Sequence, residues 1–317
     1  MTQTQESVVL DPRKFRDPDI TADGDERASV ALTHLDTLWF NTGTLCNLEC
    51  VSCYIESSPR NDRLVYLTSA EVAVYLDEIE SKGIGTREIG FTGGEPFMNP
   101  EFMIMLSDAL DRDFEVLVLT NAMKPMMGYA DNLLALRKSH TERLTIRVSV
   151  DHYTQQLHEE ERGQRSWQPT LKGLQWLSSH GFRLAVAGRT RWDDETDEQR
   201  RLGYSRLFTE HSIFVDADNP ATLVLFPEMD EQVDVPEITT ACWGTLDQSP
   251  DDIMCASARM VVKRKSSKTP TVLACTLIPY SEQFEMGETL SEAARDVKLN
   301  HPHCARFCVL GEGSCST

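Results

Sequence analysis

The sequence contains no apolar run that approaches the ~20 residues needed for a transmembrane helix. Residues 1–7 are polar, and the short apolar run 8–10 ends at Asp11, so no signal-peptide core is visible. Basic residues are also few: 31 Lys and Arg stand against 50 Asp and Glu, which gives the 317-residue chain a net charge of −19. That charge repels nucleic-acid phosphates and anionic membranes. We therefore expect a cytoplasmic protein that binds neither nucleic acid nor a membrane.

Cysteine is absent between Cys53 and Cys242, although the chain has nine cysteines. Three of them lie between Cys46 and Cys53, and the other six lie from Cys242 onward. Thiols stay reduced in the cytosol, where structural disulfides are rare. Two separate groups of cysteines in such a protein favour metal or iron–sulfur ligation over disulfide bonding.

Strand and helix patterns alternate about six times between residues 35 and 226, which indicates a parallel sheet with crossover helices. Six units are fewer than the eight of a closed barrel. We therefore expect an α/β fold with a partial (β/α)6 TIM-like barrel, although a doubly wound sheet fits the same pattern. In either fold the chemistry lies at the C-terminal ends of the strands. Strands are expected at 35–41, 88–92, 115–119, 144–150, 183–187 and 221–226, and helices at 68–82, 99–111, 128–138, 170–180 and 195–209.

The chain divides into three parts by composition. Residues 1–33 are polar and acidic, and we expect a loosely attached, flexible arm, or else a short arm packed over the barrel rim. Residues 34–235 would form the barrel. Residues 236–317 would form a small cysteine-rich domain whose short, broken segments could not build a good core without a bound metal centre.

The first cysteine group, Cys46, Cys50 and Cys53, follows the first expected strand within a single loop. A structural zinc site needs four ligands, and no fourth Cys or His lies nearby in the sequence. An iron–sulfur cluster held by three cysteines would keep one iron without a protein ligand. The group therefore favours a reactive iron–sulfur centre, with a zinc-stabilised loop as the alternative.

This C-x3-C-x2-C spacing after a first strand resembles the signature of the radical S-adenosylmethionine (SAM) superfamily. The resemblance implies a [4Fe–4S] cluster that binds SAM at its open iron and cleaves it reductively to a 5′-deoxyadenosyl radical, which abstracts hydrogen from substrate. It also implies a flavodoxin- or ferredoxin-like reductant. One departure from the family pattern is Ser52, which stands where the family often has an aromatic residue or His; Tyr54 follows the third cysteine instead.

Three further segments resemble family motifs at successive strand ends. Gly93, Gly94 and Glu95 form a GGEP motif, in which the resemblance assigns the carboxylate to the SAM ammonium group. Ser149 belongs to an S-x-D segment and would bind the SAM ribose, and Arg162 belongs to an Arg-Gly pair and would bind the SAM carboxylate, a task suited to a guanidinium fork. Taken singly, these segments could be a capped turn, a helix cap and a solvated helix end. The Thr-Asn pair at 120–121 is a weaker match.

The C-terminal cysteines resemble the SPASM and twitch extensions that carry auxiliary [4Fe–4S] clusters on many family members. A SPASM domain usually has seven cysteines, whereas this segment has six and lacks a C-x2-C pair. We therefore expect one auxiliary cluster in an atypical domain, or a single structural zinc as the alternative. The expected ligands are Cys255, Cys275, Cys304 and Cys308, with Cys315 nearly as good a candidate and Cys242 a weaker one.

The sequence thus predicts a radical SAM enzyme that acts on a small molecule or a peptide. Residues 1–33 are too few for a peptide-recognition domain, which favours a small molecule or a peptide delivered by another protein. The rival hypothesis is a non-catalytic barrel scaffold with zinc in both cysteine groups. The intact GGEP segment argues against that rival, because a zinc scaffold needs no site for a SAM ammonium group.

Overall fold

The computed structural model describes residues 9–192 and 195–311. Within these ranges no helix is long and apolar enough to cross a membrane. The strands are β1 Ser29–Val30, β2 Thr37–Asn41, β3 Glu88–Thr92, β4 Glu115–Thr120, β5 Leu144–Ser149, β6 Arg183–Arg189, β7 Leu223–Phe226, β8 Ala258–Val262, β9 Thr271–Leu273 and β10 Val297–Lys298. The helices are α1 Ser69–Lys82, α2 Phe102–Asp111, α3 Lys124–Met127, α4 Ala130–Ser139, α5 Gln155–Arg162, α6 Trp167–Ser179, α7 Asp197–Glu210 and α8 Cys242–Leu246.

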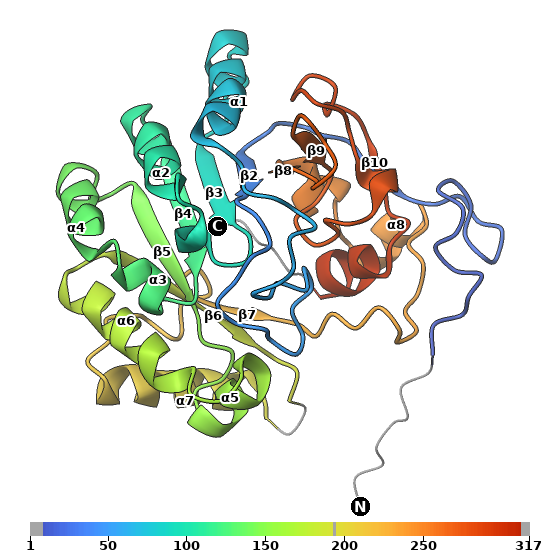
Figure 1. Cartoon of the computed structure of the whole chain (residues 1–317). Coiled ribbons are helices and arrows are strands. Elements are labelled where there is room, and N and C mark those ends of the chain that lie inside the picture. The colour runs from blue at the N-terminus through green and yellow to red at the C-terminus, as the bar shows by residue number, and fades with distance from the viewer. Residues whose placement is uncertain (1–8, 193–194, 312–317) are drawn as a thin grey trace, which may run out of the picture.

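Eight strands of the described ranges form one sheet in the order β7-β6-β5-β4-β3-β2-β8-β9. Strands β7 to β2 and β8 are parallel, and β9 returns antiparallel to β8. The sheet curves with its helices on the outside (Figure 1), and no pairing among the described strands joins β7 to β9. The expected α/β partial barrel is therefore confirmed, and all six expected strands lie within it.

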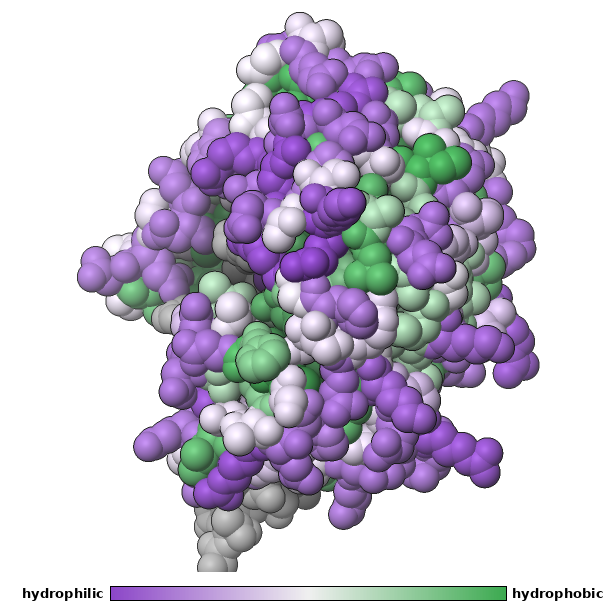
Figure 2. Space-filling view, turned by 90° about the vertical axis from the view of Figure 1, so that its left-hand side faces the viewer, coloured by the Kyte–Doolittle hydropathy of each residue, from purple (hydrophilic) through white to green (hydrophobic). Residues whose placement is uncertain are grey.

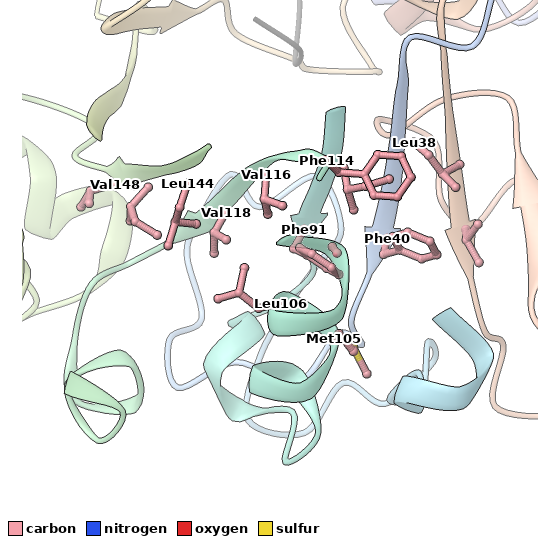
Figure 3. Packing of buried hydrophobic residues seen from close by; sticks show 14 of the residues in the cluster. Leu38, Phe40, Phe91, Met105, Leu106, Phe114, Val116, Val118, Leu144 and Val148 are labelled. Carbon is pink, nitrogen blue, oxygen red and sulfur yellow. The ribbon is translucent and has the colours of Figure 1, made fainter. Parts of the chain in front are cut away.

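The main core fills the space between the sheet and its outer helices. Phe40 and Phe91 stack at a centroid distance of 5.8 Å, and Phe91 meets Phe102 of α2 edge to face at 5.4 Å. Figure 3 shows these strand side chains above Met105 and Leu106 of α2. A second, smaller cluster fills the inner face of the sheet and contains no residue of α1–α7. Helices on one face only distinguish this fold from a doubly wound sheet.

Helix α1 begins and ends as its sequence predicts. Thr68 and Glu71 form a capping box, in which each side chain accepts a hydrogen bond from the other residue's backbone N–H. Gly83 ends the helix in the left-handed conformation. The expected start of the next helix at Asn99 was wrong by three residues. The Asn99 amide instead donates to the carbonyls of Thr42 and Leu67, so Asn99 fixes a turn and α2 starts at Phe102.

The C-terminal segment joins the barrel sheet more closely than its broken sequence suggested. β8 lies parallel to β2, with Thr37 opposite Ala258, so the segment after residue 236 contributes two strands to the main sheet. In Figure 1 this orange-to-red segment packs beside the open side of the barrel. The segment is therefore anchored by backbone hydrogen bonds to the first barrel strand.

Residues 9–33 are not a loosely attached arm, and they lie along the C-terminal segment (Figure 1). β1 pairs antiparallel with β10, and Val9 forms a bridge with Val233. Arg27 is 1% exposed and forms an ion pair with Glu237 at 2.5 Å. The polar sequence of this arm did not indicate that it packs, because backbone pairing and a buried ion pair hold it in place without an apolar face.

Hydrophilic side chains cover most of the helix-bearing face of the molecule, with small separate apolar patches (Figure 2). This distribution agrees with the excess of acidic residues in the sequence.

The close approach of α6 to the loop after β4 gives a test of the fold. A Cβ at Gly173 would lie 1.8 Å from the Ala122 carbonyl oxygen, whereas a Cβ at Gly244 in α8 would meet nothing within 4 Å. Gly173→Ala should therefore lower stability by about 1–3 kcal/mol, the usual cost of overpacking. Gly244→Ala should be neutral or stabilise by up to about 1 kcal/mol, because alanine favours helix. Thermal unfolding of both variants tests this; equal effects would contradict the described packing.

Candidate functional site

A cavity lies at the C-terminal ends of the barrel strands. It has about 1070 Å³ of space free of atoms, its opening to solvent included. It is lined by seven of the eight residues that the sequence assigns to the cluster and SAM: Cys46, Cys50, Cys53, Gly93, Gly94, Ser149 and Arg162. We call it the barrel cavity.

The loop that carries the three cysteines is fixed at several points. The Cys46 backbone N–H donates to the Ser58 carbonyl at 3.1 Å. The Glu161 carboxylate, which is fully buried at the end of α5, accepts hydrogen bonds from the N–H and hydroxyl of Ser52 at 2.8 and 3.1 Å. The Tyr280 hydroxyl of the C-terminal segment donates to the Ile55 carbonyl at 2.6 Å. The loop is therefore held by both the barrel and the C-terminal segment.

The cysteine sulfurs lie in surroundings that suit metal ligands. Burial raises the pKa of Cys46 to about 12 and that of Cys50 to about 11. A nucleophilic cysteine has a lowered pKa, so these thiols are poor nucleophiles without a bound cation. Backbone N–H groups of Leu48 and Ser57 donate to the sulfurs of Cys46 and Cys53 at 3.4 and 3.3 Å. Such hydrogen bonds stabilise metal-bound thiolates and tune their clusters.

The two glycines after β3 bring the GGEP segment against the cysteine loop. Gly93 has φ +145°, and a Cβ there would lie 2.6 Å from the Gly43 carbonyl oxygen. A Cβ on Gly94 would lie 2.2 Å from the Leu45 carbonyl oxygen. The backbones themselves are bonded, because the Gly94 N–H donates to Gly43 at 2.7 Å and the Glu95 N–H donates to Leu45 at 3.1 Å. The absence of side chains therefore permits this contact, and both glycines also line the barrel cavity.

Glu95 lies beside the barrel cavity and not among the residues that line it. It is 1% exposed, and its carboxylate accepts hydrogen bonds from the Thr120 hydroxyl at 2.8 Å and the Asn121 N–H at 2.9 Å. The weakly matching Thr-Asn pair after β4 thus positions the carboxyl group. Burial raises the pKa of Glu95 to about 7, although these hydrogen bonds act in the opposite direction. A cation bound nearby would favour the ionised form.

Arg162 lines the barrel cavity and is held by Asp151. Its Nε donates to the Asp151 carboxylate, which also forms an ion pair with Arg189 at 3.4 Å. Burial would raise the pKa of Asp151, but the two guanidinium groups outweigh burial and lower it. Asp151 therefore stays ionised between two arginines, and all three side chains line the barrel cavity.

A second, smaller cavity lies in the C-terminal segment. It is lined by Cys255, Cys275, Cys304 and Cys308, four of the five cysteines that the sequence assigns to an auxiliary centre, and also by His303. Burial raises the pKa of Cys255 to about 11 and that of Cys304 to about 12. We call it the four-cysteine cavity.

The other two C-terminal cysteines lie apart from this set. Cys242 does not line the four-cysteine cavity, and its sulfur accepts a hydrogen bond from the Thr239 N–H at 3.3 Å. Cys315 lies outside the described residues.

The spacing of the thiols bears on which metal could bind. Four sulfurs at about 2.3 Å from one zinc ion lie about 3.8 Å from one another. Within residues 9–192 and 195–311, no three cysteine sulfurs lie within 4.8 Å of one another. Among the described residues, neither cysteine group is therefore already gathered around a position for one tetrahedral ion.

The motifs and geometry agree with a match to a family model described as the radical SAM superfamily, which covers residues 40–202. This match spans half of the chain. The chain belongs to the radical SAM superfamily.

Curated relatives match this radical SAM chain over part of its length. The antilisterial bacteriocin subtilosin biosynthesis protein AlbA of Bacillus subtilis is 30% identical over 193 residues, which are 59% of this chain and 39% of AlbA. The mycofactocin maturase MftC of Mycobacterium tuberculosis is 28% identical over 137 residues, which are 43% of this chain and 33% of MftC. The chain therefore spans well under half of either relative.

Two solved structures share the fold. SuiB of Streptococcus suis, bound to S-adenosylmethionine, has a TM-score of 0.57 at 12% identity, with 80% of this chain and 63% of SuiB covered. The anSMEcpe structure with bound AdoMet has a TM-score of 0.56 at 12% identity, with 81% of this chain and 79% of that chain covered. These likenesses agree with the radical SAM fold.

Sequence analysis missed several residues of this radical SAM site. Glu161 accepts a hydrogen bond from Ser52 of the cysteine loop, and Arg189 forms an ion pair with Asp151. Arg147 lines the barrel cavity from β5. Glu161 directly precedes the Arg-Gly pair in the sequence, and this position next to an expected SAM-binding residue was its signal as a site residue. Arg147 stands two residues before Ser149, so strand alternation could have placed both on the same face.

The shared carboxylate Asp151 gives a second test. Asp151→Asn would leave the guanidinium groups of Arg162 and Arg189, each 13% exposed, without their common counter-charge, which should destabilise the protein by about 2–4 kcal/mol. Asp197→Asn is the matched control, because Asp197 is 61% exposed and pairs with Arg201 on a helix surface. The control should change stability by at most about 0.5 kcal/mol. Thermal unfolding under anaerobic conditions measures both, and an unchanged Asp151→Asn variant would contradict the described ion pairs.

Proposed function

We propose that this protein is a radical SAM enzyme that cleaves S-adenosylmethionine reductively and abstracts hydrogen from a peptide substrate. One observation carries the proposal: three cysteine thiols and the Arg162–Asp151 pair meet in one cavity at the C-terminal ends of the parallel strands, beside the buried Glu95 carboxyl group. That edge is where the active sites of barrel enzymes lie.

The residues present fit the cofactors that the family implies. Cys46, Cys50 and Cys53 would hold a [4Fe–4S] cluster, because all three line one cavity and the sulfurs of Cys46 and Cys53 accept hydrogen bonds from backbone N–H groups. Three thiolates leave one iron of such a cluster open to SAM. When bound, the cluster and SAM supply electron transfer and hydrogen abstraction, which protein side chains cannot perform alone.

The chain's own side chains bind and orient the cofactor. Glu95 would accept a hydrogen bond from the SAM ammonium group. The positive charge of that group would favour the ionised form of this buried carboxyl group. Arg162 would bind the SAM carboxylate through its planar fork. Ser149 would bind a ribose hydroxyl, and Tyr54, which also lines the barrel cavity, offers a ring for the adenine in place of the family's usual aromatic residue.

The four-cysteine cavity would hold one auxiliary [4Fe–4S] cluster, with Cys315 as a further candidate ligand. Leu277 lines both cavities, so its side chain forms part of the wall between them. The reductant would be a flavodoxin- or ferredoxin-like protein. In support, Val51 of the cysteine loop is 72% exposed and offers an apolar contact next to the SAM-binding cluster.

Similarity to named relatives favours a peptide as substrate over a small molecule. AlbA is named for bacteriocin biosynthesis, MftC is named a maturase, and SuiB has been solved with a precursor peptide, SuiA. The barrel cavity opens to solvent, so an extended peptide could enter it from the surface.

Metal analysis tests the cofactor assignment. The anaerobically reconstituted protein should contain about eight irons per chain, and a Cys46/Cys50/Cys53→Ala triple variant about four, because each cubane contributes four. The reduced wild type should show an electron paramagnetic resonance signal that changes when SAM is added, and the variant should show no such change. Cys242→Ala is the matched control and should keep all eight irons. Zinc without iron in the wild type would instead support the scaffold hypothesis.

The raised pKa of Glu95 predicts how SAM affinity depends on pH. Only the ionised carboxylate pairs with an ammonium group, and a pKa of about 7 means that the ionised fraction rises as the pH rises from 6 to 7.5. SAM should therefore bind about eightfold more tightly at pH 7.5 than at pH 6. Glu95→Gln should bind SAM more weakly and without this trend, as equilibrium binding to the reconstituted proteins would show. The same pH dependence in both proteins would remove Glu95 from the ammonium site.

A further inference from the structure

His303 is a buried polar side chain in the wall of the four-cysteine cavity. It is 3% exposed and directly precedes Cys304, one of the expected cluster ligands. Its ring therefore borders the space that the auxiliary cluster would occupy. Apart from His303 and the four cysteines, the residues that line this cavity are apolar: Ile253, Met254, Leu277, Ile278, Val297 and Leu299.

Glu231, in the segment that follows β7, orients the His303 ring. The Nε2 atom of His303 lies 3.2 Å from a carboxylate oxygen of Glu231, and Nε2 of His301 lies 3.5 Å from the same oxygen. The Nδ1 atom of His301 accepts a hydrogen bond from the His303 backbone N–H at 3.2 Å, which fixes the turn before Cys304. The Nε2–H of His303 is thus directed at a carboxylate, the usual partner of a histidine that serves a metal centre through its other nitrogen.

The other ring nitrogen of His303, Nδ1, is buried and has no hydrogen-bond partner among the described residues. The two nitrogens of an imidazole point in diverging directions, so a ring whose Nε2 faces Glu231 turns Nδ1 away from that carboxylate. A buried polar nitrogen without a partner lowers stability. This cost favours a partner for Nδ1 within the cavity that the ring lines.

The auxiliary cluster would supply acceptors for such a hydrogen bond. The thiolate and sulfide sulfurs of an iron–sulfur cluster accept hydrogen bonds and cannot donate them, and a [4Fe–4S]²⁺ core with four thiolates is net negative. One expected ligand already has a backbone donor, because the Leu277 N–H donates to the Cys275 sulfur at 3.3 Å. An N–H of His303 would add a donor from a side chain.

Anionic acceptors would then face both nitrogens of the His303 ring, with the Glu231 carboxylate at Nε2 and a cluster sulfur at Nδ1. The imidazolium form donates from both nitrogens. Its positive charge would lie between two negative groups, which compensates its burial. Four cysteines line the cavity and already complete the ligand set of one cubane, so Nδ1 is not needed as a fifth ligand.

We propose that His303 donates a hydrogen bond from Nδ1 to a sulfur of the auxiliary cluster, with Glu231 as the counter-charge at Nε2, and so raises the reduction potential of that cluster. Reduction adds negative charge to the sulfurs, and a hydrogen-bond donor therefore stabilises the reduced form more than the oxidised form. This inference rests on the proposed function, because it requires the auxiliary cluster in the four-cysteine cavity.

Reduction potentials test the inference in the full-length Cys46/Cys50/Cys53→Ala variant, so that the auxiliary cluster alone is measured. In that background His303→Leu should keep about four irons and favour the oxidised cluster at least tenfold more, a fall of about 60 mV in a one-electron midpoint potential. His303→Asn should restore part of the loss, because its amide can donate from a position close to that of Nδ1. Four irons with an unchanged potential in His303→Leu would overturn the inference.

His301→Gln is the matched control for these variants. His301 faces the same Glu231 oxygen and is 14% exposed, but it is not among the residues that line the four-cysteine cavity. Its replacement should therefore leave the potential of the auxiliary cluster unchanged. Equal shifts in His301→Gln and His303→Leu would assign the effect to charge near Glu231 and would overturn a direct hydrogen bond from His303.

Pulsed electron paramagnetic resonance detects the contact without any change to His303. When the same background protein is labelled with ¹⁵N in its histidines, the reduced auxiliary cluster should show a weak ¹⁵N coupling, as expected for a hydrogen-bonded ring. A strong coupling would show that His303 ligates iron, and no coupling would show that its ring does not contact the cluster. Either result would overturn the inference even if the His303 variants fail to fold.

The proposed function has a separate readout. A wild type whose reduced-cluster signal does not change on addition of SAM would overturn the radical SAM assignment and leave the measurements on His303 valid. A Cys46/Cys50/Cys53→Ala variant that binds no iron would instead remove the auxiliary cluster, and the inference about His303 with it.

Discussion

The backbone contact between the cysteine loop and the GGEP segment is the constraint on which the site depends. Two hydrogen bonds, Gly94 to Gly43 and Glu95 to Leu45, join the loops that follow β2 and β3. They form only because neither glycine has a side chain to separate the two backbones. This contact places Cys46 and the Glu95 carboxyl group on neighbouring strand ends. The contact therefore brings a cysteine thiol and a buried carboxyl group to the same end of the sheet.

Much of the barrel could be predicted because its signals are local. Each of the six expected strands is an apolar run, and the Thr68 capping box and Gly83 mark the ends of α1 within one residue. The cysteine and GGEP motifs were found for the same reason, since their residues are adjacent in sequence. The parallel sheet then places them together, because successive strand ends meet at one edge.

The parts that could not be predicted depend on contacts between distant segments. β8 pairs with β2 across more than 200 residues, and no local pattern in its short apolar run indicates a partner in the barrel. The packing of residues 9–33 depends on Arg27 reaching Glu237, and polar residues in a polar arm give no such signal. Glu161 is similar: it is one of several glutamates on α5, and only the fold shows that it binds the cysteine loop.

The C-terminal segment lines part of the barrel cavity and also carries the second group of thiols. Leu277 lies two residues after Cys275, and Phe307 directly precedes Cys308, so two side chains that wall the barrel cavity are adjacent to two expected cluster ligands. A metal centre that fixes those thiols would also fix the wall and exclude water from the cavity. A metal centre in the four-cysteine cavity would therefore also affect the wall of the barrel cavity, through residues that are neighbours in the chain.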